Sequence, residues 1–159
     1  MVNEVKSNND VLEVEMLELI AGGNSYGVNV SDIREILPYI KRPKPIPNAQ
    51  PFIEGIMMPR DFLIPIINLM ECLRLKPIEN EMKDMLIITS INDLNIAFHV
   101  DGVKGIMRIM NTDIKEPGKN LTAPENNATS GIINIEDRMI KILDLRKIML
   151  DINPEIEVE

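Results

Sequence analysis

Residues 55–70 read GIMMPRDFLIPIINLM, and residues 131–146 repeat the same pattern as GIINIEDRMIKILDLR. Six of the sixteen aligned pairs are identical, and three others keep an aliphatic residue or methionine opposite another. A second repeat lies upstream, where residues 26–36 (YGVNVSDIREI) align with residues 96–106 (IAFHVDGVKGI). A period of roughly 70 residues is longer than a solenoid unit, so the duplication predicts two related subdomains.

Composition and charge exclude several classes of protein. The chain has 159 residues, of which 45% are hydrophobic and 26% charged, as in a folded globular protein. Its net charge of −8 and low aromatic content argue against a nucleic-acid interface and against binding to an anionic membrane. A single cysteine, Cys72, and a polar segment at residues 1–10 without an export signal predict a cytoplasmic location.

Most of the chain alternates apolar and polar residues with period two, which is typical of half-buried strands. Short turns separate these runs, such as Gly22-Gly23-Asn24 and Ile91-Asn92-Asp93. Strands are expected at 11–20, 26–30, 52–58, 62–67, 85–90, 95–100 and 103–110, with two more in the second copy of the repeat. About ten short strands favour small Greek-key or SH3-like barrels over a layered α/β fold.

The expected helices are short. Residues 31–37 predict one or two helical turns that begin at a Ser31 cap. Asn68 and its repeat equivalent Asp144 are expected to cap helices at 69–75 and 145–150. The proline-rich segment 38–51 should be extended, and 111–130 is the longest expected irregular connection.

An ordered set of motifs resembles the CheW-like domain of bacterial chemotaxis. The set covers about residues 11–150, and its members follow one another at the intervals usual for the family. They are Tyr26-Gly27-Val28, Ile33-Arg34-Glu35-Ile36, Ile46-Pro47-Asn48-Ala49, Pro51-Phe52-Ile53-Glu54-Gly55-Ile56 and Ile64-Pro65-Ile66-Ile67-Asn68-Leu69. One departure is the turn 58–61, which reads Met-Pro-Arg-Asp where the family usually has Asn-Leu-Arg-Gly.

The resemblance implies a mainly β fold of two intertwined SH3-like five-stranded β-barrel subdomains with a few short helices. The expected ranges are a flexible segment at 1–10, subdomains at about 25–75 and 83–150, and a tail at 151–159. Within the family the chain is most similar to the N-terminal domain of CheV proteins, in which a receiver domain follows. A stand-alone CheW is the alternative.

The resemblance also implies a role. Proteins of this family couple chemoreceptor signalling tips to the histidine kinase CheA, without enzymatic activity or a cofactor. Ile33, Glu35, Ile36, Val103 and Ile106 resemble positions that line the groove for the helical hairpin of the receptor. The same isoleucines could instead pack the barrel core, because their i, i+3 spacing suits both roles.

The resemblance places a partner-sensitive arginine at Arg60, which could also be a solvated turn residue or bridge the barrels. The basic stretch 41–44 is a candidate patch for an acidic partner. His99 is the only histidine of the chain, which is too few ligands for a metal site, and it is expected on a strand at the seam between the subdomains. Cys72 is expected to be a buried, small apolar residue. Neither copy of the repeat groups a nucleophile with a base, which disfavours an enzyme. The main rival to the adaptor role is therefore a small-ligand-binding double barrel with a pocket between its halves.

Overall fold

The computed structural model describes residues 11–59, 61, 63–117 and 128–152, and this part of the chain is mainly β. The strands are β1 (Glu13–Ala21), β2 (Asn24–Asn29), β3 (Ile33–Pro38), β4 (Ile53–Met57), β5 (Ile64–Asn68), β6 (Met85–Ile91), β7 (Leu94–Val100), β8 (Gly102–Met110), β9 (Thr129–Ile135) and β10 (Arg138–Leu143). The helices are α1 (Leu69–Cys72) and α2 (Leu145–Ile152), with 3-10 turns at Val30–Asp32 and Asn111–Asp113. The expected fold class is confirmed.

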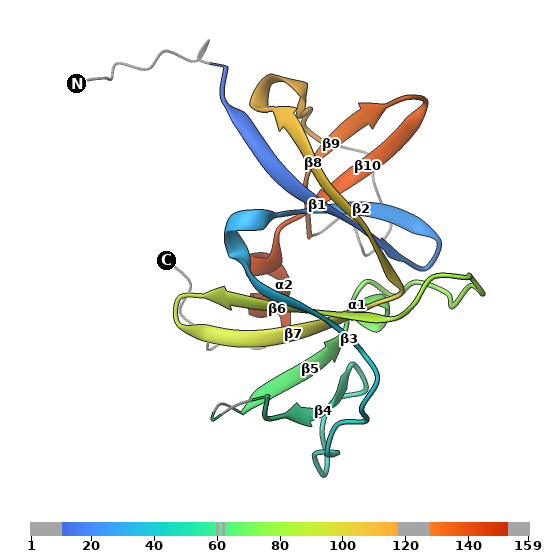
Figure 1. Ribbon diagram of the computed structural model, residues 1–159, viewed down its shortest axis with the longest axis vertical. Coiled ribbons are helices and arrows are strands. Elements are labelled where there is room, and N and C mark those ends of the chain that lie inside the picture. The colour runs from blue at the N-terminus through green and yellow to red at the C-terminus, as the bar shows by residue number, and fades with distance from the viewer. Residues whose placement is uncertain (1–10, 60, 62, 118–127, 153–159) are drawn as a thin grey trace.

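The strands form two five-stranded sheets of identical topology. Sheet 1 has the order β8-β1-β2-β10-β9, and sheet 2 has the order β3-β6-β7-β5-β4. Position by position, β3, β6, β7, β5 and β4 of sheet 2 correspond to β8, β1, β2, β10 and β9 of sheet 1. In Figure 1 sheet 1 occupies the upper half of the molecule and sheet 2 the lower half. The repeat seen in the sequence is therefore a repeat of the fold.

The two halves of the chain exchange strands. Each sheet combines a hairpin from one half with three strands from the other, and a parallel pair joins them. In sheet 1 the parallel pair is β2 with β10, and in sheet 2 it is β5 with β7. The sheets thus draw on both of the ranges 25–75 and 83–150, so each sequence repeat contributes to two sheets.

In each sheet, a residue outside the named strands pairs with an edge strand: Lys44 with β4 in sheet 2, and Lys115 with β9 in sheet 1. Lys44 exchanges backbone hydrogen bonds with Ile56, at 3.0 and 2.9 Å, and Lys115 does the same with Ile132, at 2.8 Å each. Gly55, at φ +153°, allows the first approach, because a Cβ there would collide with the carbonyl oxygen of Lys44. The identical glycine in the two repeats lies beside this pairing.

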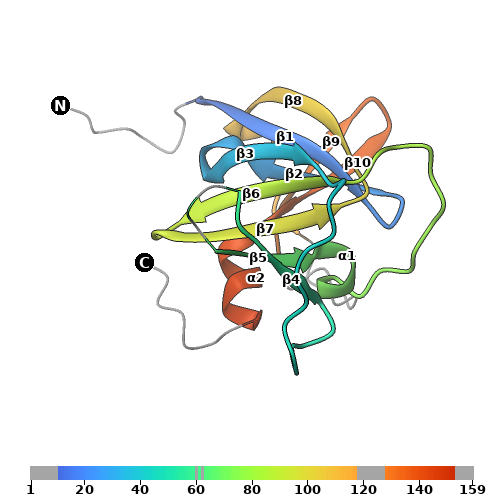
Figure 2. The same cartoon turned by 60° about the horizontal axis from the view of Figure 1, so that its bottom comes forward.

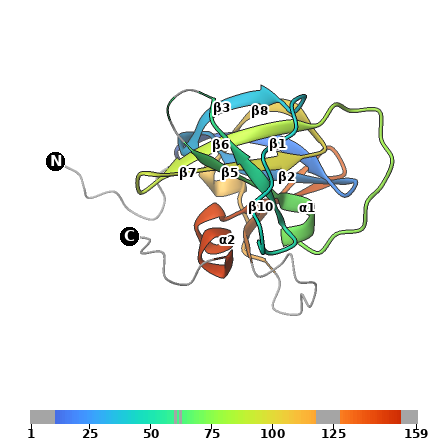
Figure 3. The same cartoon turned by 90° about the horizontal axis from the view of Figure 1, so that it is seen from below.

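The largest apolar cluster belongs to both sheets. Leu17 and Tyr26 come from sheet 1, Ile87 and Phe98 from sheet 2, and both helices add residues to it. Two smaller clusters each lie within one sheet. The helices lie at the level of the junction in Figure 1 and share one face of the molecule in Figures 2 and 3. The sheets therefore share a core and are expected to fold together.

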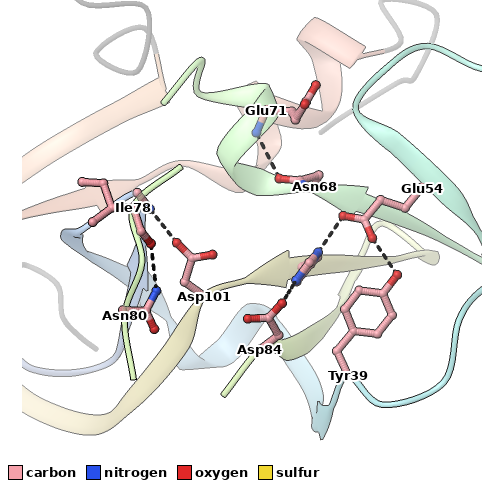
Figure 4. A network of polar contacts seen from close by, with 10 residues as sticks. Tyr39, Glu54, Asn68, Glu71, Ile78, Asn80, Asp84 and Asp101 are labelled. Atoms are coloured by element: carbon pink, nitrogen blue, oxygen red, sulfur yellow. Dashed lines mark hydrogen bonds and ion pairs between the residues drawn. The ribbon is translucent and has the colours of Figure 1, made fainter. Parts of the chain in front are cut away.

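Turns and caps confirm several expectations. Asn92 and Asp93 have φ of 50° and 64°, which is the geometry of a two-residue hairpin turn that Asn and Asp tolerate. Asp137 (φ 64°) takes the same role between β9 and β10. The Asn68 side chain accepts a hydrogen bond from the amide of Glu71 in α1, as Figure 4 shows, and Asp144 accepts hydrogen bonds from the first amides of α2.

The prediction of a helix at 31–37 is wrong. The 3-10 turn Val30–Asp32 is capped by Asn29 rather than Ser31, and the strand β3 follows directly. The misleading i, i+3 spacing arises from a β-bulge. Ile33 pairs with Thr89 and Glu35 with Ile88, so one extra residue shifts the alternation and leaves apolar residues three apart. The helix expected at 69–75 is shorter, and that expected at 145–150 extends to Ile152.

Candidate functional site

Five of the six residues expected to bind partners lie on β3 and β8, the repeat-equivalent edge strands of the two sheets. Both strands carry a bulge at a basic residue. Arg34 is the extra residue in β3, and Lys104 is the extra residue in β8, where Leu19 pairs with Val103 and Glu18 with Gly105. A bulge bends an edge strand and turns its side chains, so these two edges have a similar local shape.

The side chains divide into two groups. Ile33, Ile36 and Val103 are half-buried and pack against the cluster shared by both sheets. Glu35 is also half-buried. Ile106, in contrast, is 58% exposed on the outer face of β8, between the exposed Lys104 and Arg108. Within this set Ile106 presents the largest exposed apolar surface, although its repeat equivalent Ile36 packs inward.

A second apolar surface lies at one end of sheet 2. It is an open pocket of about 390 Å³, bounded by the segment after β3 and the β4–β5 hairpin. The buried side chains of Ile66 and Leu86 lie at its floor, and Met58 (60% exposed) and Leu63 (62% exposed) lie at its rim. The remaining lining residues are Lys41, Arg42, Pro43, Lys44, Ile56, Met57 and Pro59.

The rim of this pocket is basic in an acidic protein. Lys41, Arg42 and Lys44 are exposed, and none of the three forms an ion pair within the part of the chain that the structure describes. The chain as a whole carries a net charge of −8. An apolar floor with a cationic rim suits an apolar side chain flanked by acidic residues. The pocket belongs to sheet 2 alone, so it is not the inter-barrel cavity that a double-barrel ligand-binding protein would need.

His99 is the centre of a polar network that sequence reasoning missed. Its Nδ1 lies 2.6 Å from Oε2 of Glu54, and its Nε2 lies 2.8 Å from Oδ2 of Asp84. The hydroxyl of Tyr39 donates to Oε1 of Glu54 at 2.6 Å (Figure 4). His99 lies on β7 as expected, but all its side-chain partners belong to sheet 2. They lie 45 and 15 residues away in the sequence, so no local pattern reveals them.

Sheet 1 has its own buried charge. Glu18 on β1 is 7% exposed and accepts a hydrogen bond from Nη1 of Arg138 on β10 at 2.5 Å, with Lys104 of β8 4.0 Å away. Burial opposes ionisation of Glu18, but Arg138, Ser25 and Lys104 outweigh it and hold the pKa of the carboxyl below its usual value. The ion pair joins three strands, which is a structural role.

The described residues offer little catalytic machinery. They contain no group of three or more His, Cys, Asp or Glu side chains able to hold a metal ion. Burial, followed by the charges of Glu71 and Asp151, raises the pKa of the Cys72 thiol to about 12, so the thiolate nucleophile is scarce at neutral pH. Among the helices that the structure describes, none is long and apolar enough to cross a bilayer.

Several sequence predictions fall outside the described residues. They include Arg60, the segment 1–10, most of the tail at 151–159 and the middle of the connection at 111–130. The role of Arg60 therefore stays a prediction from the sequence.

Comparison with known proteins identifies the family. The model of the CheW-like domain matches residues 15–153, which is most of the chain. The chain therefore belongs to the CheW-like domain family. A crystal structure of the scaffolding protein TtCheW from Thermoanaerobacter tengcongensis has the same fold, with a TM-score of 0.75 and 24% identity over 83% of this chain and 89% of that one.

Curated relatives agree with this assignment. A chemotaxis protein CheW of Thermotoga maritima is 31% identical over 68% of this chain and 70% of its own length. CheW of Bacillus subtilis is 21% identical over 85% of this chain and 86% of its own. CheV3 of Helicobacter pylori is 29% identical over 80% of this chain but only 42% of its own length. The matches to the CheW proteins thus extend over most of both chains, and the match to CheV3 extends over less than half of that protein.

Proposed function

We propose that this chain is a non-enzymatic cytoplasmic adaptor that couples chemoreceptor signalling tips to the histidine kinase CheA. Membership of the CheW-like family supports a role in chemotaxis. The observation that carries the proposal is the presence of two separate apolar surfaces on one shared core, around Ile106 on sheet 1 and at the basic-rimmed pocket on sheet 2. A rigid body with two docking faces holds two partners in a fixed orientation.

We assign the β8 edge, together with β3, to the helical hairpin of the receptor. The residues involved are Ile33, Glu35, Ile36, Val103 and Ile106. An exposed isoleucine flanked by Lys104 and Arg108 offers the apolar and charged contacts that an amphipathic helix requires. The basic-rimmed pocket is then assigned to CheA. Arg60, which in the sequence lies between β4 and β5, is assigned to the same partner. Each contact can be weak, because receptor arrays bind through many copies at once.

The direct test is to measure binding of the chain to a receptor signalling fragment and to the CheA regulatory domain by calorimetry. The proposal expects measurable binding to both, and simultaneous binding in a three-component titration. Binding to neither partner would remove the adaptor role. Competition between the partners for one site would remove the two-surface arrangement.

Ile106→Asp is expected to weaken receptor binding by at least about tenfold while leaving the fold intact. Ile106 is 58% exposed, so the charge is solvated in the free protein, whereas docking would bury it without a partner. Met139→Asp is the matched control, since Met139 is a 54% exposed apolar strand residue of the same sheet. Equal receptor affinity for the two variants would exclude Ile106 from the interface. Ile33→Asp, in contrast, should lower the stability of the protein as well as its receptor affinity, because Ile33 packs against the shared core.

Arg60→Glu is expected to weaken association with CheA and to leave the thermal midpoint nearly unchanged, because the sequence places Arg60 in a turn, and a turn residue contributes little to the core. Lys147→Glu on α2 makes the same change of charge at an exposed site and serves as the control. Binding isotherms and thermal melts of both variants test this. If Arg60→Glu binds CheA as tightly as Lys147→Glu does, the arginine is not a contact.

A further inference from the structure

Four side chains, two in strands of sheet 2 and two next to its strands, form one connected group, which we call the histidine clamp: Glu54 on β4, His99 on β7, Tyr39 directly after β3 and Asp84 directly before β6. The imidazole of His99 lies between the carboxylates of Glu54 and Asp84, and Tyr39 donates to the second oxygen of Glu54. The rings of Tyr39 and His99 meet edge to face, with centroids 4.4 Å apart. Figure 4 shows Tyr39 and Glu54 in contact and Asp84 on the opposite side of the imidazole.

A β-bulge aims Glu54 at His99. The register of β4 against β5 moves from Ile53 opposite Ile67 to Gly55 opposite Ile66, so Glu54 is the extra residue. Sheet 1 has the equivalent bulge at Ser130. There, however, the position equivalent to His99 is Asn29, whose side chain caps the 3-10 turn instead. The clamp is therefore specific to sheet 2. Sheet 1 has the equivalent bulge without the histidine, so it serves as an internal control for the effect of His99.

The clamp joins the two edges of sheet 2. Tyr39 directly follows the edge strand β3, and Glu54 lies in the opposite edge strand β4. The amide of Tyr39 also donates to the carbonyl of Asp84 at 3.1 Å. The residues after Tyr39 form the basic wall of the pocket and reach Lys44, which pairs with Ile56. Loosening the clamp would thus release the segment that shapes the pocket.

Both ring nitrogens of His99 face carboxylate oxygens. A neutral imidazole has one N–H donor, so it can satisfy one carboxylate and must present a lone pair to the other. The imidazolium form donates to both. Burial alone would lower the pKa of His99, but the hydrogen bonds and charges of Glu54 and Asp84 raise it above its ordinary value of 6.5. Geometry and charge therefore favour the same protonated state.

Glu54 and Tyr39 keep their protonation states around neutral pH. Burial opposes ionisation of Glu54, but hydrogen bonds from His99, Tyr39 and Asn68 hold its pKa below the usual 4.5. Burial and Glu54 raise the pKa of Tyr39 above its usual 10, although Arg42 acts in the opposite direction. Tyr39 therefore remains a donor and Glu54 an acceptor while His99 titrates.

We propose that the protonation of His99 is a pH-sensitive switch that fastens the segment 39–44 to β4 and thereby fixes the shape of the basic-rimmed pocket. The switch is closed when the imidazole is charged and loosens when it is neutral. The proposal concerns the free protein and does not depend on which partner the pocket binds.

The direction of the pH dependence follows from linkage. Because the pKa of His99 is raised on folding, its stabilising contribution is complete below about pH 6.5 and is lost as the pH rises through the folded-state pKa. One proton changes the opening equilibrium by up to about tenfold per pH unit in that window. Glu54, whose pKa is lowered, stabilises above about pH 4.5 and loses its contribution as the pH falls further.

Amide hydrogen exchange measured by NMR tests the switch on the intact chain. The amides of Lys44 and Ile56 report on the clamped segment, and those of Lys115 and Ile132 report on the equivalent pair in sheet 1. After correction for intrinsic exchange, protection at the first pair should fall about tenfold or more from pH 6 to pH 8.5. Protection at the second pair should change much less. Since the chain has one histidine, its imidazole resonance gives the matching titration.

Two variants separate titration from coupling. In His99→Gln, protection at Lys44 should no longer depend on pH in this range. In Tyr39→Phe, the imidazole should still titrate between Glu54 and Asp84, but protection at Lys44 should no longer follow it. Parallel loss of protection in both sheets of the wild-type protein would overturn the proposal, as would an unchanged pH dependence in His99→Gln. The wild-type comparison stands even if His99→Gln fails to fold.

Discussion

Replacing Phe98 by alanine is expected to lower the free energy of unfolding by about 3–5 kcal/mol, the range for a buried aromatic side chain truncated in a core. Phe98 is 2% exposed and belongs to the cluster that Leu17 and Tyr26 of sheet 1 share with Ile87 of sheet 2. Single domains are stable by only about 5–15 kcal/mol, so the variant should lose a large fraction of its stability. Urea unfolding followed by circular dichroism measures the loss.

The same variant tests whether the two sheets form one cooperative unit. Because the cluster spans both sheets, amides of β1 in sheet 1 and of β6 in sheet 2 should lose protection together. Leu63→Ala, at a 62% exposed position, is the control and should shift stability by less than about 0.5 kcal/mol. If sheet 1 kept its protection while sheet 2 unfolded, the shared core would not couple the two.

Reversing two charges on the pocket rim, as Lys41→Glu with Lys44→Glu, is expected to weaken CheA binding by at least about tenfold, or about 1.4 kcal/mol. Both lysines are exposed beside the apolar floor, so reversal would place like charges against an acidic partner surface. The loss should be greatest at low salt and smaller at high salt, because screening weakens contacts between exposed charges.

A matched double variant controls for net charge. Lys76→Glu with Lys147→Glu reverses two exposed lysines elsewhere and changes the total charge by the same −4. Its CheA affinity should remain close to that of the unmodified protein. Equal loss in both double variants would show a long-range charge effect and would remove the pocket from the interface.

Much of the fold could be predicted from the sequence because the repeat and the period-two pattern are local signals. The hairpins around Asn92 and Asp137, and the caps at Asn68 and Asp144, follow from side-chain chemistry at single positions. The exchange of strands between sheets could not be derived from that pattern. It depends on parallel pairs such as Ile66 with Ala97, and periodicity gives no information about which strands pair over such distances.

The site was less predictable than the fold. Ile33 and Ile36 showed helical spacing because a β-bulge inserts Arg34, and a bulge leaves no clear signature in one sequence. Their repeat equivalents Val103 and Ile106 share the spacing, yet only Ile106 is largely exposed. The histidine clamp could not be found from the sequence, because Glu54 reaches His99 only after β4 pairs with β5 and β5 pairs with β7.

The most direct test of the adaptor role is a bridging experiment with a receptor signalling fragment fixed to beads and CheA in solution. We predict that the beads retain CheA when this chain is added and much less without it. Ile106→Asp should strongly reduce bridging by weakening receptor binding, and Lys41→Glu with Lys44→Glu should strongly reduce it by weakening CheA binding while the chain stays on the beads. If CheA were retained equally with and without the chain, the proposed coupling function would be contradicted.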